Sequence, residues 1–213
     1  MDVIGCIFLA LSIIAFAVVI GFAITWLVGF VKKSKGASSV GKTGTIISGS
    51  ITLAFLLIGI GFLGIFAYQQ NKKEQEFIAV SEKFQKEYDA TIFSLDNKNN
   101  AVDEAWSYYL FSDDDSTPID ATDVADGFSI TEMDNHFDKL DSYIEKLKQN
   151  DTGELKLSYH YYQRAYNKLD GYRNLTYHPV AKGYLGFVEK SSDYSNSVEN
   201  YSKKIKRFND GKL

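Results

Sequence analysis

Residues 36–43 read GASSVGKT and match the phosphate-binding pattern GxxxxGK[ST] letter for letter. This pattern binds nucleotide phosphates when a buried strand precedes the loop, a soluble helix follows it and a second strand brings an Asp to magnesium. Here a long uncharged apolar segment lies on each side of the motif. We therefore predict no nucleotide site, but a flexible Gly/Ser turn whose lysines lie near anionic lipid head groups.

The other residues with metal chemistry lack the spacing of a known site. His136, His160 and His178 form no HExxH or related pattern, and no cysteine follows Cys6. The acidic segment 113–127 holds six aspartates, including Asp113, Asp114 and Asp115. A calcium loop starting at residue 113 would need Gly at its sixth position and Glu at its twelfth, and the sequence has Pro and Val there. We expect a solvated acidic linker, with adventitious calcium binding as the alternative, and neither cofactor nor catalytic residues.

Two uncharged segments dominate the N-terminal third of the chain. Residues 3–31 and 43–71 contain no Asp, Glu, Lys or Arg. Because about 20 apolar residues cross a bilayer, we predict two antiparallel transmembrane helices at about 3–31 and 45–68. The competing interpretation of the first segment is a cleaved signal peptide, but the segment is too long and follows the acidic start Met1-Asp2 where a signal peptide needs a basic region.

Lysines define the orientation of this predicted hairpin. Lys32, Lys33, Lys35 and Lys42 lie in the short connection, and no basic residue precedes the first segment. The positive-inside rule then makes residues 32–44 a cytoplasmic loop and places both termini outside. The absence of cysteine from the outer region fits a bacterial cell surface better than an animal secretory pathway.

Residues 72–213 read as a separate helical domain. Apolar residues recur at three- and four-residue spacing in four predicted helices. The first continues from the second membrane helix, and the second begins at a capping box in residues 129–132. The third is capped from Asp151, and the last begins at Pro179. We predict an interruption at 96–100, a short helix at 101–111 and a loop at 113–127. The fold class is all-α, a transmembrane hairpin (1–71) followed by an extracytoplasmic antiparallel four-helix-type bundle (72–213). A dimeric coiled coil is the alternative arrangement.

Tyrosines and a basic tail are the conspicuous surface-forming residues of this domain. All 14 tyrosines lie at or after Tyr68, and at helical spacing we interpret them as core residues, with stacking on a glycan as the alternative. The tail supplies Lys203, Lys204, Lys206 and Arg207. This cluster is too small for nucleic acid, but it could contact the membrane surface, the acidic half of the bundle or an anionic wall polymer.

Two segments resemble a known family. Residues 193–208 (DYSNSVENYSKKIKRF) resemble the end of LemA family proteins, where a DYN-xx-V-xx-YN-xx-I-xx-F pattern closes a membrane-anchored helical bundle, and residues 100–107 (NAVDEAWS) are similar to the family's V-xx-AWS segment. The resemblance implies a helical bundle and brings no catalytic residue. The family normally has one membrane helix, where this sequence predicts two.

The sequence therefore predicts a non-enzymatic membrane protein that presents a helical bundle for protein–protein interaction or envelope scaffolding. Expected partners are the lipid bilayer and another membrane or envelope protein, with homo-oligomers left open and nucleic acid excluded. The alternatives are a sensor or accessory subunit of a membrane complex, and a phage-exclusion or toxin-immunity protein.

Overall fold

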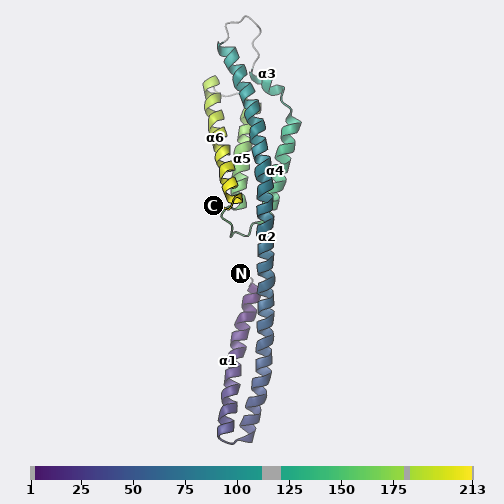
Figure 1. The fold of residues 1–213 in the computed structure, drawn as a ribbon, viewed down its shortest axis with the longest axis vertical. Coiled ribbons are helices and arrows are strands. Elements are labelled where there is room, and N and C mark those ends of the chain that lie inside the picture. The colour runs from purple at the N-terminus through teal and green to yellow at the C-terminus, as the bar shows by residue number, and fades with distance from the viewer. Residues whose placement is uncertain (1–2, 112–120, 180–182, 213) are drawn as a thin grey trace. The chain divides into compact units, whose positions relative to one another are not determined.

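Every regular element in the described part of the chain is an α-helix. The computed structural model describes residues 3–111, 121–179 and 183–212, and no strand occurs among them. The prediction of an all-helical protein is confirmed. Its six helices are α1 (Val3–Val31), α2 (Lys35–Phe111), α3 (Ala121–Asp126), α4 (Ile130–Asn150), α5 (Tyr159–Tyr177) and α6 (Tyr184–Asn209) (Figure 1). The chain divides into two units, Met1–Lys72 and Lys73–Leu213.

The turn between α1 and α2 is much shorter than the predicted loop 32–44. Lys33 has a left-handed backbone (φ 52°), its N–H bonds to the carbonyl of Phe30, and the N–H of Ser34 bonds to that of Gly29. This pair of bonds is the Schellman arrangement that closes a helix. The Ser34 carbonyl then accepts the N–H of Ser38, which starts α2. The turn itself needs only residues 32–34, so residues 35–44, predicted as loop, belong to helix α2.

Small residues face inward in the first unit. The buried positions of α2 before residue 60 are Gly41, Ser48, Thr52 and Gly59. A Cβ added to Gly41 would lie 2.3 Å from the backbone nitrogen of Trp26, so α1 approaches there too closely for any side chain. The hydroxyls of Ser48 and Thr52 donate to carbonyls four residues earlier in α2, at 2.6 and 2.8 Å. Such a small-residue seam lets two helix backbones approach closely.

Helix α2 continues through the predicted interruption at 96–100 and through the predicted separate helix 101–111. Its buried face runs on without a break through Leu95, Asn99 and Val102. Polar residues in this stretch have partners on other helices: Tyr172 donates to Asp96 at 2.8 Å, and Asn99 bonds Ser191 at 2.5 Å. These tertiary bonds explain why a turn-like local composition remains helical.

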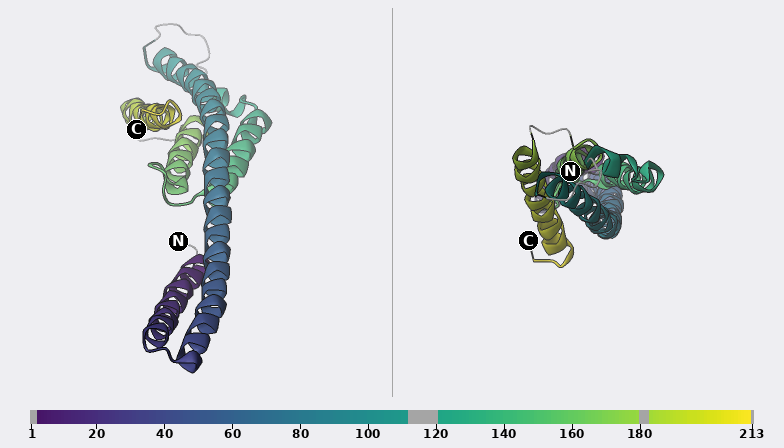
Figure 2. Two further views of the ribbon diagram at one scale, coloured as in Figure 1. Left: turned by 60° about the horizontal axis from the view of Figure 1, so that its bottom comes forward. Right: turned by 90° about the horizontal axis from the view of Figure 1, so that it is seen from above.

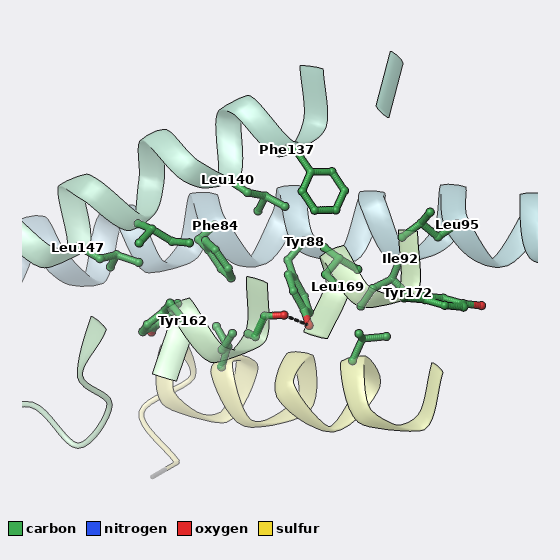
Figure 3. Close-up of a cluster of buried hydrophobic side chains, with 14 of the residues drawn as sticks. Phe84, Tyr88, Ile92, Leu95, Phe137, Leu140, Leu147, Tyr162, Leu169 and Tyr172 are labelled. Atoms are coloured by element: carbon green, nitrogen blue, oxygen red, sulfur yellow. Dashed lines mark hydrogen bonds between the residues drawn. The ribbon is translucent and has the colours of Figure 1, made fainter. Parts of the chain in front are cut away.

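The core of the second unit draws on α2, α4, α5 and α6, which lie alongside one another there (Figures 1 and 2). Phe84 is fully buried; its ring stacks on Tyr88 with centroids 5.5 Å apart and meets Tyr162 edge-on at 5.2 Å. From α4, the predicted stripe is buried at Met133, Phe137, Leu140, Ile144 and Leu147. Figure 3 shows these aromatic and aliphatic side chains meeting between the helices.

The starts of the last three long helices follow the sequence signals unevenly. Ser129 is the N-cap of α4, as predicted, and its hydroxyl accepts the Glu132 N–H at 3.4 Å. Helix α5 begins at Tyr159, later than expected, because the Asp151 carboxylate bonds both Gly153 N–H within the loop and Tyr159 N–H at the helix start.

Helix α6 and the acidic segment also differ from the prediction. Helix α6 begins at Tyr184, after Gly183 with a left-handed backbone (φ 86°), and not at Pro179. Residues 180–182 lie outside the described residues. Part of the predicted acidic loop 113–127 forms α3, because Ala125 is buried in a second cluster with Val102 and Phe187. Residues 112–120 also lie outside the described part.

Candidate interaction surface

A basic-aromatic patch, defined here as Tyr161, Arg164, Tyr201 and Lys204, joins α5 to α6. The Lys204 Nζ lies 4.8 Å from the centroid of the Tyr161 ring, and the Arg164 guanidinium lies 5.8 Å from it. The Tyr201 ring meets Tyr161 at 5.0 Å. A cation that lies over an aromatic ring is stabilised by electrostatic attraction to the ring, and it remains accessible to an anionic partner. The patch therefore offers positive charge on an ordered aromatic base.

The predicted tail cluster surrounds one buried residue. Lys203, Lys204, Lys206 and Arg207 are exposed, whereas Ile205 between them is buried in the core. Lys203 is engaged by Glu199 at 2.5 Å, one turn earlier in α6. Because Ile205 anchors the helix, the four cations project from a fixed scaffold and not from a loose tail.

A chain of hydrogen bonds holds the end of α6 in place. Ser81 of α2 donates to the Asn209 side-chain oxygen at 2.5 Å, so its own oxygen accepts from the Tyr162 hydroxyl at 2.6 Å. The Asn209 amide donates in turn to Gln85 at 2.7 Å. The bonds run through α5, α2 and α6 in sequence, and they fix the helix end that carries the cations.

Three buried tyrosines of the second unit resist ionisation. Desolvation by burial raises the pKa of the Tyr88 hydroxyl well above its ordinary value, and that hydroxyl donates to the Ala165 carbonyl at 3.1 Å (Figure 3). Burial likewise raises the pKa of Tyr162 and of Tyr172, which also faces the Asp96 carboxylate. The pKa of Tyr161 is also raised, by burial and by Tyr201, and the nearby Arg164 only partly offsets this rise. Tyr88, Tyr162 and Tyr172 are buried in the core, as predicted for the tyrosine stripes, whereas Tyr159, Tyr166, Tyr194 and Tyr201 are only partly buried.

An ion-pair cluster joins α4 to α2. The Glu87 carboxylate bonds the His136 ring nitrogen Nδ1 at 2.6 Å and the Lys139 Nζ at 3.2 Å. His160 lies against the Tyr159 ring with centroids 4.0 Å apart, and His178 caps the end of α5. Within the described residues, no three side chains of His, Cys, Asp or Glu form a group that could hold a metal.

The other sequence-predicted site residues are four lysines of the first unit and three aspartates. Lys32 and Lys33 occupy the turn after α1, and Lys35 and Lys42 lie in the first turns of α2, all four exposed. Residues 36–43, the phosphate-loop match, are helical and do not form a loop. Asp113, Asp114 and Asp115 lie outside the described residues.

Sequence reasoning missed a polar face near the end of α2. The side-chain oxygens Asn99 Oδ1 and Asp103 Oδ1 and the indole nitrogen Trp106 Nε1 are buried without a hydrogen-bond partner in the described structure. Their spacing of four and three residues places them on one side of the helix. The sequence prediction places Asn99 in the interruption 96–100, and Asp103 and Trp106 in the short helix 101–111, so it does not join the three on one helix face.

Comparison with protein-family models, with curated proteins and with solved structures found no match.

Proposed function

We propose that this protein is a non-enzymatic integral membrane protein. In this proposal α1 and the first part of α2 form a two-helix transmembrane hairpin with a cytoplasmic turn. Residues 73–213 form an extracytoplasmic antiparallel four-helix-type bundle that binds another membrane or envelope protein. The bundle acts as an interaction or scaffold module of the cell envelope.

The observation that carries the membrane assignment is the side-chain distribution of the first unit. Two helices are long and apolar enough to cross a membrane by length and composition. Most of their described large apolar side chains point outward, with Ile13 70% exposed and Phe30 72% exposed, whereas the buried residues are small or carry a hydroxyl. In water such a surface would associate or aggregate, but in hydrocarbon it costs nothing to expose. The hydroxyls on the inside bond their own helix, which satisfies them without water.

The orientation rests on the lysines of the turn. Lys32, Lys33 and Lys35 lie within four residues between the two apolar segments, and Lys42 follows about two turns further along α2. Cationic residues near a membrane end favour the cytoplasmic side. Both termini and the helical domain are then extracytoplasmic.

The interaction role rests on the basic-aromatic patch and the tail cations around it. They present clustered positive charge on rigid helices, and aromatic and Arg residues are the types enriched where proteins bind one another. An acidic partner surface is the matching chemistry. A sensor or accessory subunit is the second candidate, because α2 is one helix that supplies residues to both units.

Photo-crosslinking in intact cells tests the interaction role. A photoreactive residue at Lys206, on the exposed side of α6, is expected to capture one envelope protein reproducibly. A matched probe at Lys148, an exposed lysine of α4, is expected not to capture it. Capture should fall when Lys204 and Arg207 are replaced by Ala. Equal capture from both positions, or none from Lys206, would contradict the proposal, while capture of an external toxin or phage protein would favour the immunity alternative.

A further inference from the structure

A groove of about 450 Å³ lies between α5 and α6 in the second unit. From α5 it is lined by Lys168, Asn174 and His178, and from α6 by Lys190, Asp193 and Tyr194. The groove is distinct from the basic-aromatic patch, with which it shares no residue. Its lining is polar, with ammonium, amide, imidazole, phenol and carboxylate groups on facing helices.

Tyr194 forms a fixed wall of this groove. A Cβ at Gly171 would lie 2.6 Å from the Cε1 atom of Tyr194, so the glycine allows the ring to lie directly against α5. The ring also stacks on Tyr172, with centroids 6.3 Å apart and planes inclined by 14°. Lys168 extends over the same ring, its Nζ 5.1 Å from the centroid. The aromatic wall and the Lys168 stem therefore hold each other in place before any ligand arrives.

The described lining of the groove carries more positive than negative charge. The structure shows no ion pair for Lys168 or Lys190 among the described residues, and Asp193 is the one carboxylate in the described lining. The surrounding segment 155–213 has 11 basic and 5 acidic residues, a net charge of +6. Two ammonium groups with amide and phenol donors beside them are suited to a phosphate, which offers several strong acceptor oxygens. Asp193 can accept a hydrogen bond in the same groove, so it suits a ligand that carries hydroxyl groups next to its phosphate.

We propose that the α5–α6 groove binds the phosphate group of a phosphorylated polyol. Lys168 and Lys190 bind the phosphate oxygens, Asn174 adds an amide donor, and Asp193 accepts from a hydroxyl of the polyol. Tyr194 packs against the carbon chain. This assignment goes beyond the proposed scaffold function and does not depend on which side of the membrane the domain occupies. The phosphate ester can come from a soluble metabolite, a lipid head group or a wall polymer.

Calorimetric titration of the full-length protein in zwitterionic micelles tests this site. With glycerol 3-phosphate as the probe, we expect saturable binding that weakens roughly tenfold in each of Lys168→Ala and Lys190→Ala, since a hydrogen bond to a charged group is lost. The matched control replaces Lys148, an exposed lysine of α4 outside the groove, and binding to Lys148→Ala should stay within about twofold of wild type. Asp193→Asn should weaken glycerol 3-phosphate binding and leave binding of inorganic phosphate unchanged or stronger.

Further probes distinguish the sources of the ester. Tighter binding to nanodiscs containing phosphatidylglycerol than to phosphatidylcholine nanodiscs would indicate the lipid head group, and tighter binding of poly(glycerol phosphate) would indicate a polymer. Lys168→Arg, which keeps the charge, should retain binding, and far-UV circular dichroism should show the same helix content in every variant. The proposal is overturned if the wild-type protein binds neither phosphate probe saturably, or if Lys148→Ala weakens binding as much as the groove variants do.

Discussion

The two units of this protein bury opposite kinds of side chain. The first unit encloses Gly41, Ser48, Thr52 and Gly59 and exposes most of its described Ile, Leu, Val and Phe residues. The second unit encloses Phe, Tyr, Leu and Ile residues and exposes its charges. Water drives large apolar side chains into a core, whereas lipid hydrocarbon does not. The contrast is therefore what we expect if the first unit lies in a membrane and the second in water. Helix α2 shows both patterns: small and hydroxyl residues are buried in its first part, and large apolar residues are buried from Phe77 onward.

The largest effect should come from the aromatic core of the second unit. Phe84→Ala removes a fully buried ring that contacts Tyr88 and Tyr162, and we expect it to lower the free energy of unfolding by about 3–5 kcal/mol. Phe93→Ala, nine residues further along α2, removes a ring that is 69% exposed and should change stability by no more than about 0.5 kcal/mol. Urea unfolding, followed by Trp106 fluorescence in a Trp26→Phe background, measures both. Similar losses in the two variants would break the assignment of the core.

Alkaline pH should destabilise the second unit through its buried phenols. Tyr88, Tyr162 and Tyr172 have pKa values raised above the ordinary 10.0, so in the folded state they remain neutral where the unfolded chain ionises. Their contribution is complete below pH 10 and is lost as the pH rises above it, by about 1 kcal/mol per tyrosine at pH 11. Urea midpoints at pH 8 and pH 11 measure the loss. Tyr88→Phe should reduce this pH dependence, and an unchanged dependence would contradict the assignment.

A wedge at the small-residue seam should separate the helices of the first unit. Gly41→Leu places a large side chain where even a Cβ would meet the Trp26 backbone, and overpacking of this kind costs about 1–3 kcal/mol. Gly21→Leu is the matched control, because nothing lies within 4 Å of a Cβ there. Cysteines introduced at Phe8 and Phe62, whose rings stack at 5.8 Å, with Cys6 replaced by Ser, report the approach by disulfide formation. Slower crosslinking is expected in Gly41→Leu alone, and equal rates in all variants would show that the seam is not a contact.

The smallest effect should distinguish two helix caps of the second unit. Ser129→Ala removes the hydroxyl that accepts the Glu132 N–H and should cost about 1 kcal/mol. Ser158 is also an N-cap but makes no side-chain capping bond, so Ser158→Ala should have little effect. The same urea measurement compares them. A larger loss of stability in Ser158→Ala than in Ser129→Ala would show that Ser158, and not Ser129, is the stabilising cap.

Periodicity predicted the helices, but tertiary contacts determined where they begin and end. The stripes of α4 and α6 were readable because their apolar residues alternate at three and four, and the cap at Ser129 has a local signature. The continuity of α2 through residues 96–100 could not be predicted from the local sequence, because it depends on hydrogen bonds to Tyr172 and Ser191, which are far away along the chain. The α5–α6 groove was hidden for the same reason: Lys168 and Lys190 are unremarkable surface lysines until two helices bring them together. The sequence also predicts Ile130 in the apolar stripe of α4, three residues before Met133, but Ile130 is 60% exposed because it is the first residue of the helix.

The contrast between the two units leads to one direct measurement. With Cys6 replaced by Ser, cysteines are introduced at Ser39 and Ser192, both exposed, and labelled in intact cells with a membrane-impermeant thiol reagent. The account predicts that Ser192→Cys reacts in intact cells, whereas Ser39→Cys reacts only after the membrane is permeabilised. Reaction of Ser39→Cys but not Ser192→Cys in intact cells would reverse the orientation. Equal reaction of both positions, whether or not the cells are permeabilised, would contradict the membrane hairpin itself.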